Sequence, residues 1–235
     1  MTRTQFVTRW DIAETTGAVV VVDVLRAFTT AAYAFAAGAD HILLADSVAE
    51  ALRLKSELGD AIVLGEDGGR RPDGFDLPNS PVEVSRAAIG GRTLIMRTSA
   101  GTRGVMAARS ATRLWCTGLV CASATAAAVA GSGLGDPTYV ITGRFPDRPD
   151  GGVDDLITAR LVERARTGAN LDAGVAAHAV ANSDEAAFTL ALGGGHVHPD
   201  DIAYAVRVDL FDFAMEVRRV DGLPRLDAVP PTAES

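Results

Sequence analysis

The chain has 235 residues, a hydrophobic content of 48% and a formal net charge of −8, which suits one substantial core, and we expect one domain over residues 1–235. The acidic balance, with no basic cluster beyond two arginine pairs, argues against a nucleic-acid surface. Lys55 is the only lysine among 22 basic residues and falls on the predicted exposed face of an amphipathic helix, which removes Schiff-base and P-loop chemistry.

Short apolar runs alternate with Ala-rich or amphipathic stretches along the chain, as in α/β proteins. The predicted strands span residues 17–24, 41–46, 61–66, 92–97, 112–118 and 138–142. The first predicted helix follows the strand 17–24 and ends at residue 37. The later ones span 48–58, about 82–89, a stretch that ends at 110, 153–166, Ala-rich stretches that end at 192, and 198–206. A hairpin over 213–229 turns at Asp221-Gly222, and the tail 230–235 is expected to fray. This order predicts a three-layer α/β/α fold with a mostly parallel or mixed sheet and a C-terminal hairpin.

No segment predicts export or membrane insertion. Residues 1–17 are mixed and polar, unlike a secretory signal. The uncharged stretch 114–135 is long enough to cross a bilayer, but it is weakly apolar and its pattern predicts a strand, a turn and a helix. We therefore expect a cytoplasmic protein without a membrane partner. Whether the chain forms a homo-oligomer stays undecided at this point.

Several acidic side chains fall where the predicted strands end. Asp23 and Glu66 each follow an apolar run, whereas Asp154 and Asp155 open the helix after the strand 138–142. Ligands of open α/β sheets bind at the carboxyl ends of the strands, and a hard cation such as Mg²⁺ can share several buried carboxylates. Alternatively, Asp23 caps the following helix and Glu66 pairs with an arginine. The gathering of acids at one edge favours the site.

Two loops have the composition of an anion-binding cradle. Arg26 and Arg103 each lie at the start of a small-residue helix, where backbone N–H groups and the helix dipole attract anions. Ser99 and Thr102 add hydroxyl groups, and Gly101 permits close approach of a ligand. Ordinary helix capping explains either loop taken alone. Because the two strand–turn–helix units resemble each other, we expect both helix N-termini at the same sheet edge.

A further loop and a histidine pair need interpretation. Residues 67–81 are rich in Gly and Pro, and a loop of this length inside a compact domain is usually functional. His196 and His198 have a spacing that could serve zinc, but no third ligand is evident, and a surface turn is the favoured interpretation.

Four segments resemble, in this order, the motifs of the 2-phosphosulfolactate phosphatase family. They are VVVVDVLRAFTTAAYAFAAGA, LGEDGG followed by GFDLPNSPVE, RTSAGTRGV, and VDDLITARLV. The resemblance covers residues 19–212, and DVLRA together with GFDLPNSPVE is specific to this family. It implies a Mg²⁺-dependent hydrolase that converts 2-phosphosulfolactate into sulfolactate and phosphate, on a route toward coenzyme M.

The resemblance carries ten polar positions into this sequence. They are Asp23, Arg26, Glu66, Asp76, Asn79, Ser80, Glu83, Thr102, Asp154 and Asp155. The chain departs from the family at Pro78, where Gly is usual, at Ala100, near which the family has Asn, and in CASATA over 121–126, which lacks an Asn. These departures bear on the substrate more than on the reaction type.

The combined hypothesis is in-line attack of water on phosphorus, with Mg²⁺ held by some of Asp23, Glu66, Asp76 and Asp155. Asp76 and Glu66 are the alternative bases, and Asp23 completes the predicted catalytic set. The predicted substrate-binding residues are Arg26, Asn79, Ser80, Ser99, Gly101, Thr102 and Arg103, and the partner is a small anionic phosphate ester. The rival hypotheses are a phosphohydrolase for another such ester and a non-catalytic protein that binds an anionic metabolite.

Overall fold

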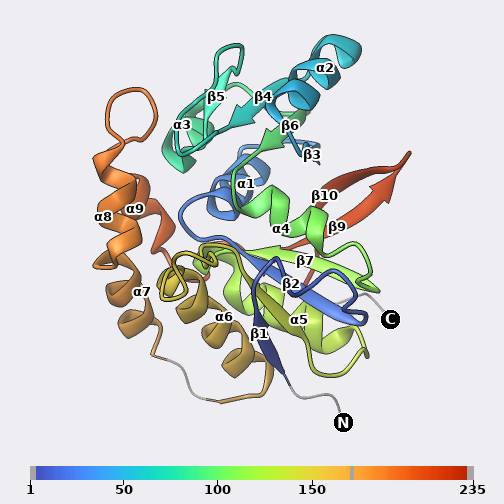
Figure 1. The fold of residues 1–235 in the computed structure, drawn as a ribbon, viewed down its shortest axis with the longest axis vertical. Helices are drawn as coiled ribbons and strands as arrows, with labels where there is room; N and C mark the ends of the chain where they lie inside the picture. Colours follow the sequence, from blue (N-terminus) through green and yellow to red (C-terminus); the bar gives the residue numbers. More distant parts are fainter. Residues whose placement is uncertain (1–3, 170–171, 232–235) are drawn as a thin grey trace.

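The structure, a computed structural model, describes residues 4–169 and 172–231. These residues form a mixed sheet with helices on both faces, so the predicted three-layer α/β/α class is confirmed (Figure 1). The strands are β1 (Gln5–Val7), β2 (Ala18–Val22), β3 (His41–Leu44), β4 (Ile62–Gly65), β5 (Leu77–Pro78), β6 (Thr93–Arg97), β7 (Arg113–Thr117), β8 (Thr138–Ile141), β9 (Ala214–Val220) and β10 (Leu223–Val229). The helices are α1 (Ala27–Ala36), α2 (Val48–Leu58), α3 (Pro81–Arg86), α4 (Gly101–Ala107), a 3₁₀ turn (Leu119–Cys121), α5 (Ala122–Gly131), α6 (Val153–Arg166), α7 (Ala173–Ala181), α8 (Asp184–Ala191) and α9 (Asp201–Ala205).

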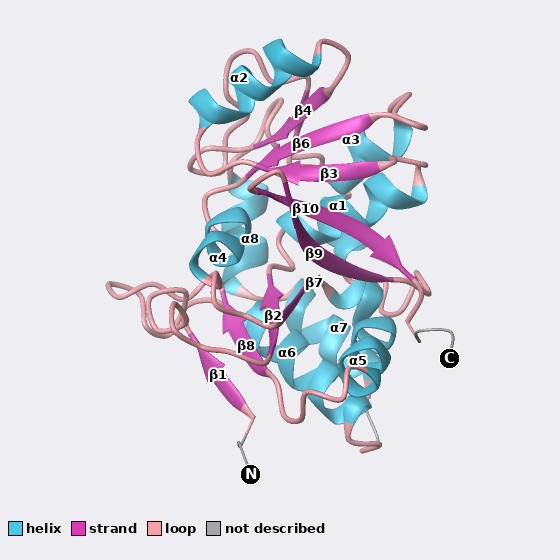
Figure 2. Ribbon diagram, turned by 90° about the vertical axis from the view of Figure 1, so that its right-hand side faces the viewer, coloured by secondary structure: helices cyan, strands magenta, loops and turns pink. Residues whose placement is uncertain are grey.

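Two groups of parallel strands make up most of the sheet. The strand order is β1-β8-β2-β7-β9-β10-β3-β6-β4-β5, with β1, β8, β2 and β7 parallel in one group and β3, β6, β4 and β5 parallel in the other. The C-terminal hairpin β9–β10 lies between the groups, antiparallel to β7 on one side and to β3 on the other. Figure 2 shows this hairpin crossing between the two groups. The predicted hairpin is therefore present, and it joins the sheet at its centre rather than at an edge.

Strand β2 shows how the layers form. Its five residues are all buried, and their side chains alternate between two apolar clusters. Val19 and Val21 pack in the cluster that contains residues of α1 and α4, whereas Val20 and Val22 pack in the cluster that contains residues of α5 and α6. Alternation with a period of two is inherent in a strand, so a continuous valine run serves both faces.

The first of these clusters also spans the two strand groups. It includes Leu44 of β3, Leu64 of β4 and Met96 of β6 besides Val21 of β2. Helix α2 covers the other face of the second group, where Leu54 packs in a cluster with residues of β3, β4 and β6. The two groups therefore share apolar core as well as the hairpin.

Some boundaries differ from the sequence predictions. The short strand β1 was not predicted, because three residues carry too little pattern. The loop 67–81 contains the two-residue strand β5, and α3 ends at Arg86 because Ala87 adopts an extended backbone. The stretch 114–135 forms β7, the 3₁₀ turn and α5, and no helix in the described ranges is long and apolar enough to cross a membrane. Of the tail predicted to fray, residues 232–235 lie outside the described ranges.

Candidate active site

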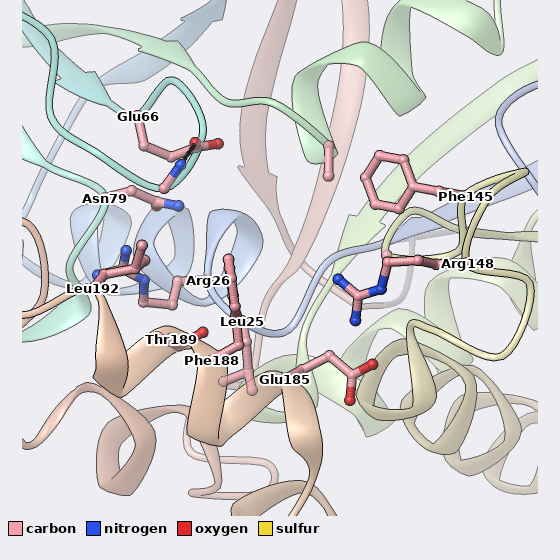
Figure 3. Close-up of a pocket in the computed structure, with 13 residues that line it drawn as sticks. Leu25, Arg26, Glu66, Asn79, Phe145, Arg148, Glu185, Phe188, Thr189 and Leu192 are labelled. Carbon is pink, nitrogen blue, oxygen red and sulfur yellow. Dashed lines mark hydrogen bonds between the residues drawn. The ribbon is translucent and has the colours of Figure 1, made fainter.

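A cavity of about 170 Å³ lies where the loops that follow both strand groups meet (Figure 3). Its walls come from residues after β2, β4, β5, β6 and β8, and helix α8 supplies one side. The lining includes Arg26, Glu66, Asn79, Ala100, Arg148 and Glu185. The carboxyl ends of strands from both groups thus serve one pocket, which is the general location of ligands in open α/β sheets.

Asp23 lies beneath this pocket, between the first turns of α1 and α4. Its Oδ1 accepts a hydrogen bond from the N–H of Ala27 at 2.9 Å. A Cβ added to Gly101 would lie 2.8 Å from both Asp23 Oδ2 and Ala27 Cβ, so only glycine lets the two helices approach this closely. The two helix N-termini therefore meet at one edge, as predicted, and Asp23 makes the capping contact that was weighed against metal binding. Burial raises the pKa of Asp23 to about 6, and hydrogen bonds from Ala27 and Gly101 oppose that rise.

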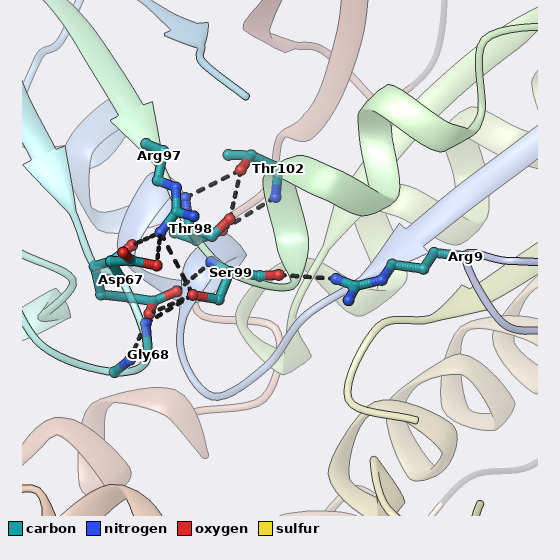
Figure 4. A network of polar contacts seen from close by, with 9 residues as sticks. Arg9, Asp67, Gly68, Arg97, Thr98, Ser99 and Thr102 are labelled. Carbon is teal, nitrogen blue, oxygen red and sulfur yellow. Dashed lines mark hydrogen bonds and ion pairs between the residues drawn. The ribbon is translucent and has the colours of Figure 1, made fainter. Parts of the chain in front are cut away.

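Glu66 is held in place by the loop after β6. Its Oε1 accepts a short hydrogen bond from the Ser99 N–H, and its Oε2 accepts from Ser99 Oγ at 3.0 Å and from the Gly69 N–H at 2.6 Å. Buried Arg97 donates to the Glu66 carbonyl and to the Asp67 carboxylate, both at 2.7 Å, and so fixes the turn that carries Glu66 (Figure 4). A carboxylate has about four lone-pair positions, which leaves room for one further partner.

The hydroxyl groups of the predicted anion cradle are used within the protein. Thr102 is fully buried, donates to the Thr98 carbonyl at 2.7 Å and accepts from the Thr98 N–H at 3.0 Å. Ser99 is hydrogen-bonded to Glu66. Arg103 is exposed on α4 and does not line the pocket. Of this loop, Ala100 lines the pocket. The structure therefore brings the helix start to the pocket but not the side chains of Thr102 and Arg103.

Arg26 lines the pocket and is only 3% exposed, because Asp201 balances its charge from behind. Its Nη1 donates to Asp201 Oδ2 at 2.9 Å and to the His196 carbonyl at 2.9 Å. Asp201 is fully buried, and its Oδ1 accepts a 2.6 Å hydrogen bond from Ser80 Oγ. The His198 N–H also donates to Asp201, at 3.0 Å. Ser80, predicted to bind substrate, thus joins the loop of residues 67–81 to α9 instead of facing the pocket.

No pattern in the sequence predicted the role of Asp201. It begins the short helix α9, where an acid is ordinary, and nothing local shows that it will be buried against a residue far along the chain. The nearby histidines contribute backbone groups to this contact, while His196 Nδ1 accepts a hydrogen bond from the Arg71 N–H. This arrangement agrees with the interpretation of His196 and His198 as a turn.

Asn79 and Asp76 stand on the same segment but occupy different environments. Asn79 is 4% exposed, lines the pocket, and its Oδ1 has no hydrogen-bond partner among the described residues. Asp76 instead lies 2.5 Å from Lys55 Nζ and accepts the Val63 N–H at 2.8 Å. It does not line the pocket, so the structure separates two residues that were expected to reach the substrate together.

The second wall of the pocket consists of the loop 143–152 and helix α8. Phe145 and Arg148 come from the loop and Glu185 from the helix, and Figure 3 shows these three across the pocket from Glu66 and Asn79. Glu185 Oε1 accepts the Gly152 N–H at 2.8 Å, and its Oε2 has no partner among the described residues.

Asp154 and Asp155 lie beneath this wall, at the start of α6. Asp155 accepts hydrogen bonds from the Val24 N–H at 2.9 Å, the Gly143 N–H at 2.8 Å and Thr142 Oγ1 at 3.1 Å, and thereby joins the ends of β2 and β8. Burial, followed by the charge of Glu185, raises the pKa of Asp154 to about 8. Burial and the neighbouring charge of Asp154 raise the pKa of Asp155 as well.

The four predicted metal ligands do not converge on one point. Asp76 is outside the pocket, Asp23 and Asp155 are engaged by backbone amides, and Glu66 alone lines the cavity. The described residues contain no group of three or more His, Cys, Asp or Glu side chains arranged to hold a metal. Mg²⁺ often needs only one or two protein carboxylates together with water and substrate phosphate, and Glu66 beside the unpartnered Asn79 Oδ1 meets that smaller requirement.

The departures from the family pattern fall at different distances from this site. Ala100 lines the pocket, so the absent asparagine removes a polar group there. Pro78 ends the edge strand β5 and pairs with Gly65 of β4, next to Asn79. Residues 121–126 begin α5, where Ser123 is bound to Asp209, and none of them lines the pocket.

Comparison with known proteins identifies the family. The family model described as 2-phosphosulpholactate phosphatase matches residues 7–219. A probable 2-phosphosulfolactate phosphatase of Bacillus subtilis (strain 168) is 31% identical over 211 residues, which cover 89% of this chain and 91% of that protein. A probable 2-phosphosulfolactate phosphatase of Thermus thermophilus is 38% identical over 145 residues, covering 61% of this chain and 59% of that protein. The chain therefore belongs to the 2-phosphosulfolactate phosphatase family, a family of phosphoric monoester hydrolases.

Proposed function

We propose that the chain hydrolyses 2-phosphosulfolactate to sulfolactate and phosphate, with Mg²⁺ as its cofactor. The substrate is taken from the names of the relatives, and the site supports it. The observation that carries the proposal is the placement of Arg26, Glu66 and Asn79 in one pocket at the start of two helices. Membership of a hydrolase family favours this activity over a protein that only binds an anionic metabolite.

The charge of the pocket supports a divalent cation. Its lining contains two basic side chains, Arg26 and Arg148, and two acidic ones, Glu66 and Glu185, and buried Asp201 already neutralises Arg26. An ester that carries phosphate, carboxylate and sulfonate needs more positive charge than these groups supply. Asn79 would hold Mg²⁺ through its unpartnered Oδ1, and Glu66, with one free lone-pair position, would stand beside the cation as the acceptor of a proton from water. When bound, Mg²⁺ supplies positive charge to phosphoryl oxygens and promotes deprotonation of water.

The protein's own groups then have distinct tasks. Arg26, which lines the pocket, orients the phosphoryl group, since a guanidinium can donate several hydrogen bonds to phosphate oxygens. Glu66 accepts a proton from the attacking water, because of the two predicted bases it is the one that lines the pocket. Asp23 sets the positions of both helices from below.

Phosphate release from a panel of esters, with Mg²⁺ or with a chelator, tests the substrate and the cofactor. We expect Mg²⁺-dependent release, with phosphosulfolactate preferred over simple monoesters. Another preferred ester would retain the enzyme class and replace the substrate. Absence of release from every ester would overturn the proposal.

The same assay decides between the two candidate bases. Glu66→Gln is expected to lower kcat by about 10²- to 10⁴-fold, the usual contribution of a positioned acid or base. Asp76→Asn is expected to change kcat less than about threefold, because it loses only a half-exposed ion pair with Lys55. The reverse ranking would restore Asp76 as the base and mean that its loop moves toward the substrate.

A further inference from the structure

The two basic side chains of the pocket are not equivalent. Arg26 is buried, and its guanidinium is bound to Asp201 and to the His196 carbonyl. Arg148 is exposed in the loop 143–152, and its guanidinium makes no hydrogen bond or ion pair with any residue in the described ranges. The charge and donors of Arg148 are therefore engaged by no group of the described residues, and a ligand in the pocket can bind them.

The position of Arg148 fits the far end of a bifunctional anion. Figure 3 shows Arg148 with Phe145 and Glu185 on one side of the pocket and Glu66 with Asn79 on the other, with Leu25 between them. A small ester with its phosphoryl group at Glu66 and Asn79 would present its other end to Arg148. The planar guanidinium suits a sulfonate or carboxylate, because it can donate two parallel hydrogen bonds.

Arg103, the other arginine predicted to bind substrate, is poorly placed for this task. Gly101 and Gly104 of α4 face inward, since a Cβ on either would lie 2.8 Å from a neighbouring side chain. Residue 103 is two positions from Gly101, which is about 200° around a helix, so it points away from that face. Arg103 is accordingly exposed and does not line the cavity.

Glu185 strengthens the dependence on Arg148. It lines the same wall, and its Oε2 has no hydrogen-bond partner among the described residues. Loss of Arg148 would therefore leave a wall with negative charge, which repels a second anionic group as well as failing to bind it.

We propose that Arg148 binds the sulfonate of the substrate, at the end of the pocket opposite Glu66 and Asn79. This inference rests on the proposed function and assigns its specificity to one side chain. Arg148 has no part in the phosphoryl chemistry, so its contribution depends on what the ester carries besides phosphate.

The test compares phosphosulfolactate with 2-phospholactate, which has a methyl group where the substrate has the sulfomethyl group. For Arg148→Ala we expect KM for phosphosulfolactate to rise about 10- to 100-fold, the effect of losing a charge-assisted contact, with kcat little changed. KM for 2-phospholactate should change less than about threefold. Arg148→Lys should recover part of the loss, and Arg160→Ala, an exposed arginine of α6, is the matched control.

Two results would overturn the assignment while leaving the proposed function intact. One is an equal loss on both esters in Arg148→Ala, and the other is a selective loss on phosphosulfolactate in Arg103→Ala with none in Arg148→Ala. Calorimetry with sulfolactate and no metal gives a second measurement, in which Arg148→Ala should bind at least tenfold more weakly than the unaltered chain. An unaltered chain that neither hydrolyses phosphosulfolactate nor binds sulfolactate would overturn both proposals.

Discussion

The two walls of the pocket are built in different ways. On the wall formed after β2, β4, β5 and β6, Glu66 accepts three hydrogen bonds, and Arg26 is fixed by a buried carboxylate. On the wall formed by the loop 143–152, Arg148 has no side-chain partner in the described ranges and is exposed. The first wall is rigidly supported, and the second presents side chains to whatever enters.

This difference separates chemistry from recognition. Groups that stabilise a transition state work best when their positions are set before the substrate arrives, and the first wall has that support. Loops tolerate substitution at little cost to the fold, so a loop is suited to the selection of one ester over another. The comparison can be tested by removing a support of each wall and measuring both stability and substrate preference.

The largest effect is expected at Asp201, the buried support of the first wall. Asp201→Asn removes the counter-charge of Arg26, and breaking a buried ion pair costs about 3 to 5 kcal/mol of unfolding free energy. KM should rise for phosphosulfolactate and 2-phospholactate alike, because Arg26 serves the phosphoryl group that both esters carry. Chemical denaturation and steady-state kinetics measure the two effects.

Asp200→Asn is the matched control, since Asp200 is 62% exposed and adjacent in sequence. If Asp201→Asn is too unstable to assay, Ser80→Ala removes one hydrogen bond to the same carboxylate together with the N-cap of α3, and should cost about 1 to 3 kcal/mol. Wild-type stability in both variants would mean that the first wall does not depend on Asp201.

A smaller effect is expected at Asp154, beneath the second wall. Burial, and then the charge of Glu185, raises its pKa in the folded protein to about 8, above the ordinary value of 3.8. Between those two pH values the folded state binds more protons than the unfolded state, so stability falls as pH rises. Asp154→Asn removes this dependence, so its free energy of unfolding at pH 8 should exceed that of the unaltered chain. We expect a difference of at least about 1.4 kcal/mol, which corresponds to one pKa unit.

Urea unfolding at pH 5 and pH 8, with a chelator present, measures this difference. Exposed Asp150 in the loop 143–152 provides the control variant Asp150→Asn, which should follow the unaltered chain at both pH values. If the free energy of unfolding changes with pH equally in Asp154→Asn and in the unaltered chain, ionisation of Asp154 does not destabilise the fold and this prediction is wrong.

The smallest effect is expected at Arg9, which connects the walls. Its Nη1 donates to the Ser99 carbonyl at 2.8 Å, and its guanidinium lies 4.3 Å from the ring centroid of Trp10 and 5.0 Å from that of Phe145. Arg9→Ala should cost about 1 kcal/mol and accelerate tryptic cleavage after Arg144, the arginine of this loop that no proline follows. Unchanged cleavage, relative to Arg160→Ala, would mean that the loop is held by other contacts.

The sequence predicted the features that depend on local pattern. The valine run of β2, the helices over 48–58 and 153–166 and the hairpin turn at Asp221-Gly222 are all found, because strand and helix periodicity and turn residues act within a few positions. The meeting of Asp23 with the glycine-led start of α4 also followed, from two similar strand–turn–helix units at one edge.

Tertiary structure decided the contacts between distant segments. Asp76 and Asn79 belong to one motif, yet Asp76 pairs with Lys55 whereas Asn79 lines the pocket, because that choice depends on how α2 packs beside the loop. Asp201 meets Arg26 from 175 positions away, and Arg148 gains its place because the loop after β8 folds over the ends of strands from the other group. Burial and charge pairing across the chain have no local periodicity, so the sequence by itself specified the elements and only the packed fold specified which side chains share a pocket.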